Sequence, residues 1–393
     1  MKKLLKSLFL FILAIFVLGN GYILLSGNTY LYTVFQMTIF KGRMGPSIDE
    51  YPAFYNREVA VGDPQPWPNS ASYNSNSITP ELQTAHEEYQ SVAYVVIQHD
   101  SVIHESYWDG YSDSSRSNSF SMAKSIVAAC IGAAIEQGYI EGVNQPVSDF
   151  FPRYGEEYVE RPITIKDLLN MSAGINFDED YLNPLAYPAR ANYGEDLREL
   201  NERYTPDRAP GKVFSYQSGE SELLSFILSK ATGMTVSEYA SKALWEPMGA
   251  EHPALWSLDG KEGDEKAFCC FNSNARDFAR FGSLYLNYGN WKGEQLIDSA
   301  FVATSRTPAT FLQNEGSPES MNTEYSQQWW TYPDYKGKYQ VFFMRGILGQ
   351  YVFVVPELDL VIVRLGHKRS SERTNGYPND IYEWLDGGIA LAK

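Results

Sequence analysis

Strand-forming segments lie at the two ends of the main body of this 393-residue chain, and helix-forming segments fill the interval between them. Residues 93–98 and 102–108 are β-rich runs on either side of His99-Asp100-Ser101, which predicts a hairpin. Three apolar runs predict further strands near the C-terminus: 340–344, 350–355 and 360–365. This order predicts an α/β (α+β) fold in which an antiparallel sheet, built from both chain ends, is flanked by helices.

Helical patterns occupy the middle of the chain. One helix is predicted from Ser121 to about Gln137, where Gly138 ends it. Another opens after Thr164, which is the expected N-cap, with Asp167 at the capping-box position. Further helices are predicted over these ranges: 219–232, 235–244, 275–287 and 379–392. A mainly helical insertion over about 121–290, within a domain spanning 81–393, follows from this pattern.

The N-terminal segment differs from the rest of the chain. Lys2, Lys3 and Lys6 precede the stretch from Ser7 to Ser26, which has no charged side chain and is long enough to cross a bilayer. Residues 1–28 are therefore predicted to form an anchor or signal segment. An uncleaved anchor is favoured over a cleaved signal peptide, after which the protein would be secreted, because no clear small-residue cleavage site follows.

The charges around the apolar stretch predict the orientation of the chain in the membrane, and the composition of the next segment predicts its structure. Lysines before the span, and none for many residues after it, predict a single-pass protein of the cell membrane with its body on the periplasmic or extracellular side. Residues 29–80 are predicted to form an irregular arm, since Pro, Asn, Ser and Tyr dominate much of it.

Composition excludes several classes of partner. A formal net charge of -16 argues against binding to nucleic acid, which needs clustered Lys and Arg. Three cysteines, Cys130, Cys269 and Cys270, give no paired disulfide framework, and Cys130 is expected to be a buried core residue. The five histidines have no metal-ligand spacing. No metal and no cofactor is therefore predicted.

Ser121-Met122-Ala123-Lys124 is the first candidate catalytic motif. A serine and a lysine three residues apart share one helix face, so the amine can reach the hydroxyl and accept its proton. The apolar run that follows predicts a buried helix, which distinguishes this pair from the many chance matches on solvated helices. The helix N-terminus adds positive potential where an oxyanion would form.

Tyr216-Gln217-Ser218 is the second motif. Pro210-Gly211 precedes it and a predicted helix follows, which places Tyr216 on a loop against a rigid support. A phenol in that position is suited to relay a proton between the serine and a leaving group.

In combination these motifs resemble the serine β-lactamase-related hydrolases. The resemblance covers most of residues 90–390 and rests on S-x-x-K, the 163–174 segment, P-G-x-x-F-x-Y-x-S at 210–218 and A-R-D-x-A-R-F-G at 275–282. The family includes class C β-lactamases, penicillin-binding D-alanyl-D-alanine peptidases, β-lactamase-fold esterases and nylon-oligomer (aminohexanoate-dimer) hydrolases. Segments 176–181, 328–330 and 346–350 resemble most the last group.

The resemblance implies a role for each site residue. Ser121 would attack a carbonyl and form an acyl-enzyme, while Lys124 and Tyr216 move its proton. The backbone N–H groups of Ser121 and Ile347 would form the oxyanion hole. The substrate would be a small-molecule amide or ester, contacted by these residues: Tyr181, Ser218, Leu348 and Gly349.

Departures from the family pattern affect the substrate. Leu348 stands where a lysine or histidine would meet a carboxylate, so the usual cation for a penicillin or a peptide C-terminus is missing. Arg345 is a possible substitute only if its strand is regular. Phe268 lies near a position where the nylon-oligomer enzymes have an asparagine.

Several alternatives therefore stay open beside an amide or ester hydrolase. They are a D-alanyl peptidase or β-lactamase, a non-catalytic penicillin-binding-like module that binds or senses peptides, and a transacylase.

Overall fold

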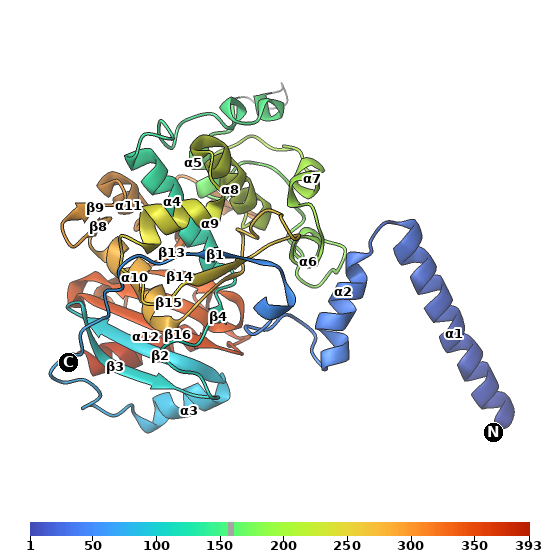
Figure 1. The fold of residues 1–393 in the computed structure, drawn as a ribbon, viewed down its shortest axis with the longest axis horizontal. Helices are drawn as coiled ribbons and strands as arrows, with labels where there is room; N and C mark the ends of the chain where they lie inside the picture. Colours follow the sequence, from blue (N-terminus) through green and yellow to red (C-terminus); the bar gives the residue numbers. More distant parts are fainter. Residues whose placement is uncertain (156–160) are drawn as a thin grey trace.

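The computed structural model describes residues 1–155 and 161–393. Its centre is a seven-stranded sheet, most of whose strands are labelled in Figure 1. The strand order is β12-β13-β14-β15-β16-β2-β3, and every neighbouring pair is antiparallel. Its strands are β2 (Ser91–Gln98), β3 (Ser101–Tyr107), β12 (Tyr325–Ser326), β13 (Trp329–Tyr335), β14 (Tyr339–Gly346), β15 (Gln350–Val355) and β16 (Leu360–Gly366). The predicted sheet from both chain ends is confirmed, because β2 pairs with β16.

Both faces of this sheet are buried. Along β2, Val95 and Ile97 belong to one core cluster, whereas Tyr94 and Val96 belong to the other. The first cluster packs under α10 (Ala275–Leu286) and α4 (Met122–Glu136), and the second under α3 (Pro80–Glu88) and α12 (Asp380–Leu391). A sheet covered on both faces explains why its strands are almost continuously apolar in sequence.

A small second sheet, order β1-β6-β7-β4, links distant segments. Its strands are β1 (Asn56–Val59), β4 (Ser117–Asn118), β6 (Ala254–Ser257) and β7 (Phe271–Ser273). Pairing of Ser117 with Ser273 sets the chain before Ser121 beside the chain that follows Phe268. These strands have two to four residues, too few for an alternation pattern to predict them.

The remaining short strands are peripheral to these two sheets. They are β5 (Val213–Phe214), β8 (Asn290–Trp291), β9 (Glu294–Gln295), β10 (Gln313–Asn314), β11 (Ser317–Met321), β17 (Arg373–Thr374) and β18 (Tyr377–Pro378). Of these, β5 pairs with β10 just ahead of Tyr216 and so fixes the loop that carries it.

The predicted helices are present. The Thr164–Asp167 capping box forms at the start of α5 (Ile165–Leu169), and Gly138 follows α4 with a φ of 76°. The others are α6 (Tyr187–Tyr193), α7 (Leu197–Glu202), α8 (Ser218–Thr232), α9 (Val236–Ala240) and α11 (Ser299–Ser305). Most of α4 is buried, including Cys130, as the apolar sequence predicted.

The N-terminal region contains two helices. Figure 1 shows α1 (Lys2–Leu25) projecting from the body, and it is long and apolar enough to cross a membrane. Four residues later α2 (Tyr30–Met37) packs against α6. Residues 29–80, where the sequence predicted an irregular arm, thus contain α2 and β1, and their buried side chains Ile48, Val59 and Trp67 join the core.

Candidate active site

Ser121 occupies the N-cap of α4 and lines an apolar cavity. The preceding Phe120 has a φ of 44°, in the left-handed region that bulky residues rarely adopt. Its N–H donates to Asn118 Oδ1 at 2.8 Å, which stabilises this sharp entry. The turn leaves the Ser121 side chain at the start of the helix and facing the cavity.

Lys124 lies one turn along α4 and is only 1% exposed. Its Nζ donates to Ser121 Oγ and to Ser218 Oγ, each at 3.2 Å, and to the Phe268 carbonyl oxygen at 2.7 Å. The pair that the spacing predicted is therefore within hydrogen-bond reach, and a third partner comes from the segment that the small sheet holds beside α4.

Tyr216 lies next to the same amine. Lys124 Nζ is 5.1 Å from the centroid of the Tyr216 ring, which packs between Trp330 (5.5 Å) and Tyr325 (5.9 Å). These aromatic contacts fix the ring on the loop between β5 and α8, as the motif's flanking sequence predicted.

Glu179 is a site residue that the sequence did not single out. Its carboxylate accepts hydrogen bonds from Ser218 N (2.7 Å), Ser218 Oγ (2.5 Å) and the hydroxyl of Tyr181 (2.7 Å). Ser218 is therefore held between Glu179 and Lys124. Glu179 stands between two aspartates in the sequence, and no local pattern distinguishes it from them.

The Phe268 carbonyl is positioned by a buried carboxyl group. Glu222 Oε2 accepts the backbone N–H groups of Ala267 at 2.9 Å and of Phe268 at 3.3 Å. Burial raises the pKa of Glu222 well above its ordinary value. The loop whose carbonyl meets Lys124 is thus anchored to α8.

The turn at residues 347–349 connects β14 to β15. Ile347 lines the cavity together with Ser121, Ser218 and Tyr181. Leu348 and Gly349 have φ values of 61° and 84°, and their carbonyl oxygens accept hydrogen bonds from Arg364 Nη1. A side chain at position 349 would meet that guanidinium at 2.3 Å, so glycine is required.

Arg345 does not line this cavity. Its guanidinium carbon lies 3.3 Å above the centroid of the Trp330 ring, and burial lowers its pKa to about 10. The strand is regular here, with Arg345 paired to Tyr351 and Gly346 to Gln350, but Ile347 already belongs to the turn. Arg345 is therefore not placed as the missing cation of the cavity.

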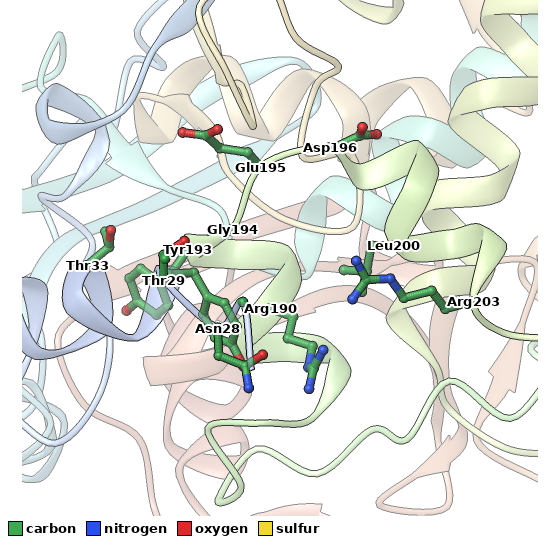
Figure 2. Close-up of a pocket in the computed structure, with 12 residues that line it drawn as sticks. Asn28, Thr29, Thr33, Arg190, Tyr193, Gly194, Glu195, Asp196, Leu200 and Arg203 are labelled. Atoms are coloured by element: carbon green, nitrogen blue, oxygen red, sulfur yellow. The ribbon is translucent and has the colours of Figure 1, made fainter. Parts of the chain in front are cut away.

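The cavity has a volume of about 400 Å³ and reaches from Ser121 to α2. Among the described residues that line it, none carries a charged side chain. A separate polar pocket of about 360 Å³ lies where α1 meets α2, lined by Arg190, Glu195, Asp196 and Arg203 (Figure 2). None of the predicted site residues lines that second pocket.

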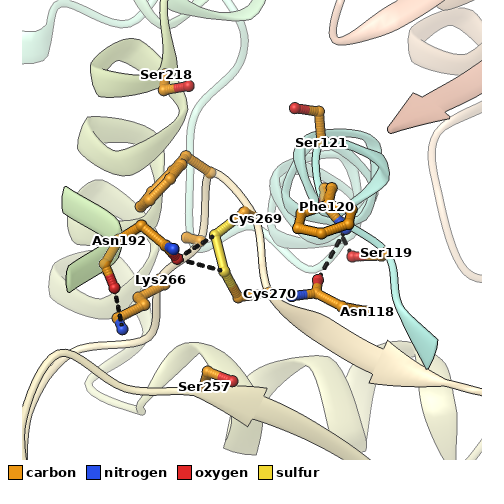
Figure 3. The surroundings of a disulfide bond; sticks show 12 residues. Asn118, Ser119, Phe120, Ser121, Asn192, Ser218, Ser257, Lys266, Cys269 and Cys270 are labelled. Atoms are coloured by element: carbon orange, nitrogen blue, oxygen red, sulfur yellow. Dashed lines mark hydrogen bonds between the residues drawn. A yellow bond between two sulfur atoms is a disulfide. The ribbon is translucent and has the colours of Figure 1, made fainter. Parts of the chain in front are cut away.

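Cys269 and Cys270 form a disulfide between adjacent residues, drawn together with Ser121 and Ser218 in Figure 3. Both sulfur atoms lie near Asn192 Oδ1, at 3.9 Å and 3.5 Å. The bond joins no two elements, which agrees with the expectation that no disulfide framework holds the domain. It is part of the wall of the cavity beside Ser121, since Cys269 lines that cavity.

The fold agrees with comparisons to known proteins. The beta-lactamase family profile matches residues 81–381. The chain belongs to the beta-lactamase family. It is 27% identical over 306 residues to the 6-aminohexanoate-dimer hydrolase of Paenarthrobacter ureafaciens, an alignment that covers 73% of this chain and 75% of the relative.

Solved structures agree with the family's fold. A candidate 6-aminohexanoate-dimer hydrolase from Bacillus anthracis superposes with a TM-score of 0.70 at 23% identity, over 88% of this chain and 92% of that one. A family VIII carboxylesterase superposes with a TM-score of 0.61 at 15% identity, over 80% and 99% of the two chains. The expected β-lactamase/transpeptidase-like fold is confirmed, and this family member is a β-lactamase-related hydrolase.

Proposed function

We propose that this family member is a serine hydrolase that cleaves a small-molecule amide or ester through an acyl-enzyme on Ser121. The observation that carries the proposal is the position of Lys124 Nζ, 3.2 Å from Ser121 Oγ on a buried helix and beside the Tyr216 ring. A nucleophile within hydrogen-bond reach of a base that other groups orient is the arrangement that covalent catalysis needs.

The proposed reaction has two steps. In the first, Ser121 Oγ bonds to the substrate carbonyl carbon while its proton passes through the Lys124 amine to Tyr216. The bond from that carbon to the departing alcohol or amine then breaks, and Tyr216 passes the proton to the leaving group. The N–H groups of Ser121 and Ile347 would stabilise the oxyanion. In the second, water attacks the acyl-enzyme, releasing a carboxylic acid and restoring the Ser121 hydroxyl.

Ser218, with Tyr181 and the 347–349 turn, would contact the substrate. The uncharged cavity lining supports a neutral substrate over a penicillin or a peptide with a free carboxylate. The name of the Paenarthrobacter relative, a hydrolase of a 6-aminohexanoate dimer, supports an amide as the substrate.

The test is hydrolysis of 4-nitrophenyl acetate by the full chain in detergent. Ser121→Ala and Lys124→Ala should each lower kcat about a thousandfold or more. Ser125→Ala is the matched control, because Ser125 is one turn further along α4 and donates instead to the Gln328 carbonyl oxygen at 2.6 Å. Equal turnover by Ser121→Ala and the unmodified chain would reject Ser121 as nucleophile, and a complete lack of turnover would favour a binding module.

We also propose that α1 is retained as a membrane anchor, with the catalytic body outside the cytoplasm. Three lysines precede its uncharged stretch, and most of its large apolar side chains are exposed. Alkaline carbonate washing of membranes should leave the mature protein in the pellet. Release into the supernatant, with residue 1–28 peptides missing from the mature chain, would instead indicate cleavage and secretion.

A further inference from the structure

The active-site cavity extends away from Ser121 along an apolar wall. Its lining includes Ser121, Phe268 and Ile347 and, from α2, Leu31 and Val34. The absence of charge among the described lining residues favours an alkyl chain over a polar group, because each buried methylene contributes favourably to binding. A volume of about 400 Å³ is in the range of sites for small ligands.

The outer rim of the cavity is an exposed apolar surface. Phe40, Met44 and Leu182 are 80%, 91% and 94% exposed, and Phe35 and Ile39 are also exposed. Of these, all but Phe40 line the cavity itself. Among the described residues beyond α1, more than half of the exposed large apolar side chains are in residues 32–44 and 181–182. Such a concentration marks a surface that contacts another apolar phase.

The position of α2 identifies that phase. Only residues 26–29 separate α2 from the candidate membrane span α1, so the rim lies within a short distance of any bilayer that α1 enters. The helix is also fixed to the body, since Tyr30 donates to the Pro184 carbonyl oxygen at 2.9 Å and contacts Arg190. The same helix thus joins the membrane side to the catalytic cavity.

Resting on the proposed hydrolase function, we propose that the substrate is a neutral amphiphile, an ester or amide of a medium or long alkyl chain, taken from the lipid surface through the rim of Phe35, Ile39, Phe40, Met44 and Leu182. The alkyl chain lies along α2 while its carbonyl meets Ser121. Water supplies the second reactant, so the products are a carboxylic acid and an alcohol or amine.

The first experiment is a chain-length series. The full chain is reconstituted in phosphatidylcholine vesicles and given 4-nitrophenyl acetate, butanoate, octanoate and dodecanoate, with Ser121→Ala as background. The expected kcat/KM rises by up to about fourfold for each methylene that becomes buried. A flat or falling series in an enzyme that hydrolyses the acetate through Ser121 would overturn this inference alone, and no Ser121-dependent turnover of any ester would reject the proposed function itself.

The second experiment places a larger side chain in the α2 wall of the cavity. Val34→Trp should remove the rise of kcat/KM with chain length, whereas Gln36→Trp, at an exposed position of the same helix outside the cavity, should keep that rise. A rise of the same size in Val34→Trp and the unmodified chain would show that the alkyl chain binds elsewhere.

The third experiment tests the source of the substrate. Phe40→Ser removes an exposed side chain of the rim that does not line the cavity. Turnover of vesicle-embedded dodecanoate should fall several-fold while turnover of dissolved acetate is unchanged. Unchanged turnover of the embedded ester would overturn delivery from the lipid surface. That result would indicate that the rim contacts a partner other than the bilayer.

Discussion

Glu179 accepts two hydrogen bonds from Ser218, one from its backbone N–H at 2.7 Å and one from its hydroxyl at 2.5 Å. The second fixes the direction of the Ser218 hydroxyl, so the oxygen presents a lone pair to Lys124 Nζ at 3.2 Å. Glu179 thereby orients the Lys124 amine through Ser218.

Glu179→Gln should therefore act on Lys124 through Ser218. Loss of a charge-assisted hydrogen-bond partner corresponds to about a tenfold to hundredfold decrease in kcat, with a smaller change in KM and an altered pH profile. Asp180→Asn is the control, because Asp180 is exposed and its carboxylate accepts the nearby Leu182 N–H at 2.8 Å. Equal kcat values and pH profiles for Glu179→Gln and Asp180→Asn would exclude the positioning role.

Tyr216→Phe should lower kcat by about a hundredfold to ten-thousandfold, because it removes a proton-transfer group. The ring contacts with Trp330 and Tyr325 would persist, so the melting temperature should change little. Tyr325→Phe removes a hydroxyl from the same aromatic cluster and should retain most of the activity. A Tyr216→Phe enzyme as active as that control would show that the phenol takes no part in proton transfer.

The Cys269–Cys270 bond predicts a specific alkylation pattern. Denatured protein treated with iodoacetamide should gain one adduct, at Cys130, and after reduction it should gain three. Three adducts without prior reduction would show that the adjacent cysteines are free thiols.

His86 should make the fold sensitive to acid. Its ring stacks between Trp108 and Trp384 and contacts Tyr94, and its Nδ1 lies 2.9 Å from Ser91 Oγ. Burial, followed by the positive charge of Arg364 and by His104, lowers its pKa to about 3. The unfolded chain binds a proton near pH 6.5 and the folded chain does not, so stability contributed by neutral His86 is lost as pH falls from about 6.5 toward 3.

The measurement is the free energy of unfolding of the unmodified chain and of His86→Phe across that range. The unmodified chain should lose roughly 3 kcal/mol more than the variant between about pH 6.5 and pH 4. Parallel curves for the two proteins would mean that His86 is protonated in the folded state.

The fold was predictable where long segments had one pattern. The hairpin at 91–107, the C-terminal strands and the buried helix after Ser121 each followed from apolar runs bounded by turns. The four-stranded sheet was not, because β1, β4, β6 and β7 are too short to show alternation and pair only through tertiary contacts. β13 was missed too, since its outer half, Tyr332–Tyr335, includes a proline and exposed positions.

Some contacts of the candidate site were likewise predictable from the sequence, and others were not. Ser121 and Lys124 share a helix, so their contact follows from spacing alone. Phe268 contacts Lys124 directly and lies 144 residues away from it in sequence. Glu179 contacts Ser218, a partner of Lys124, and lies 55 residues from Lys124 in sequence. No local sequence pattern marks either residue. The contribution of α2 to the cavity wall was not predictable from the sequence either, because residues 31–39 meet the cavity only in the folded chain.

The most direct test of the central claim is the mass of the protein during turnover. The full chain in detergent is mixed with 4-nitrophenyl butanoate, quenched in acid after the first turnover, digested and sequenced by mass spectrometry. The acyl-enzyme mechanism predicts a butanoyl group on Ser121, absent in Ser121→Ala and present in Ser125→Ala. Steady turnover with the acyl group on another side chain, or with Ser121 unmodified at every quench time while Ser121→Ala is equally active, would contradict it.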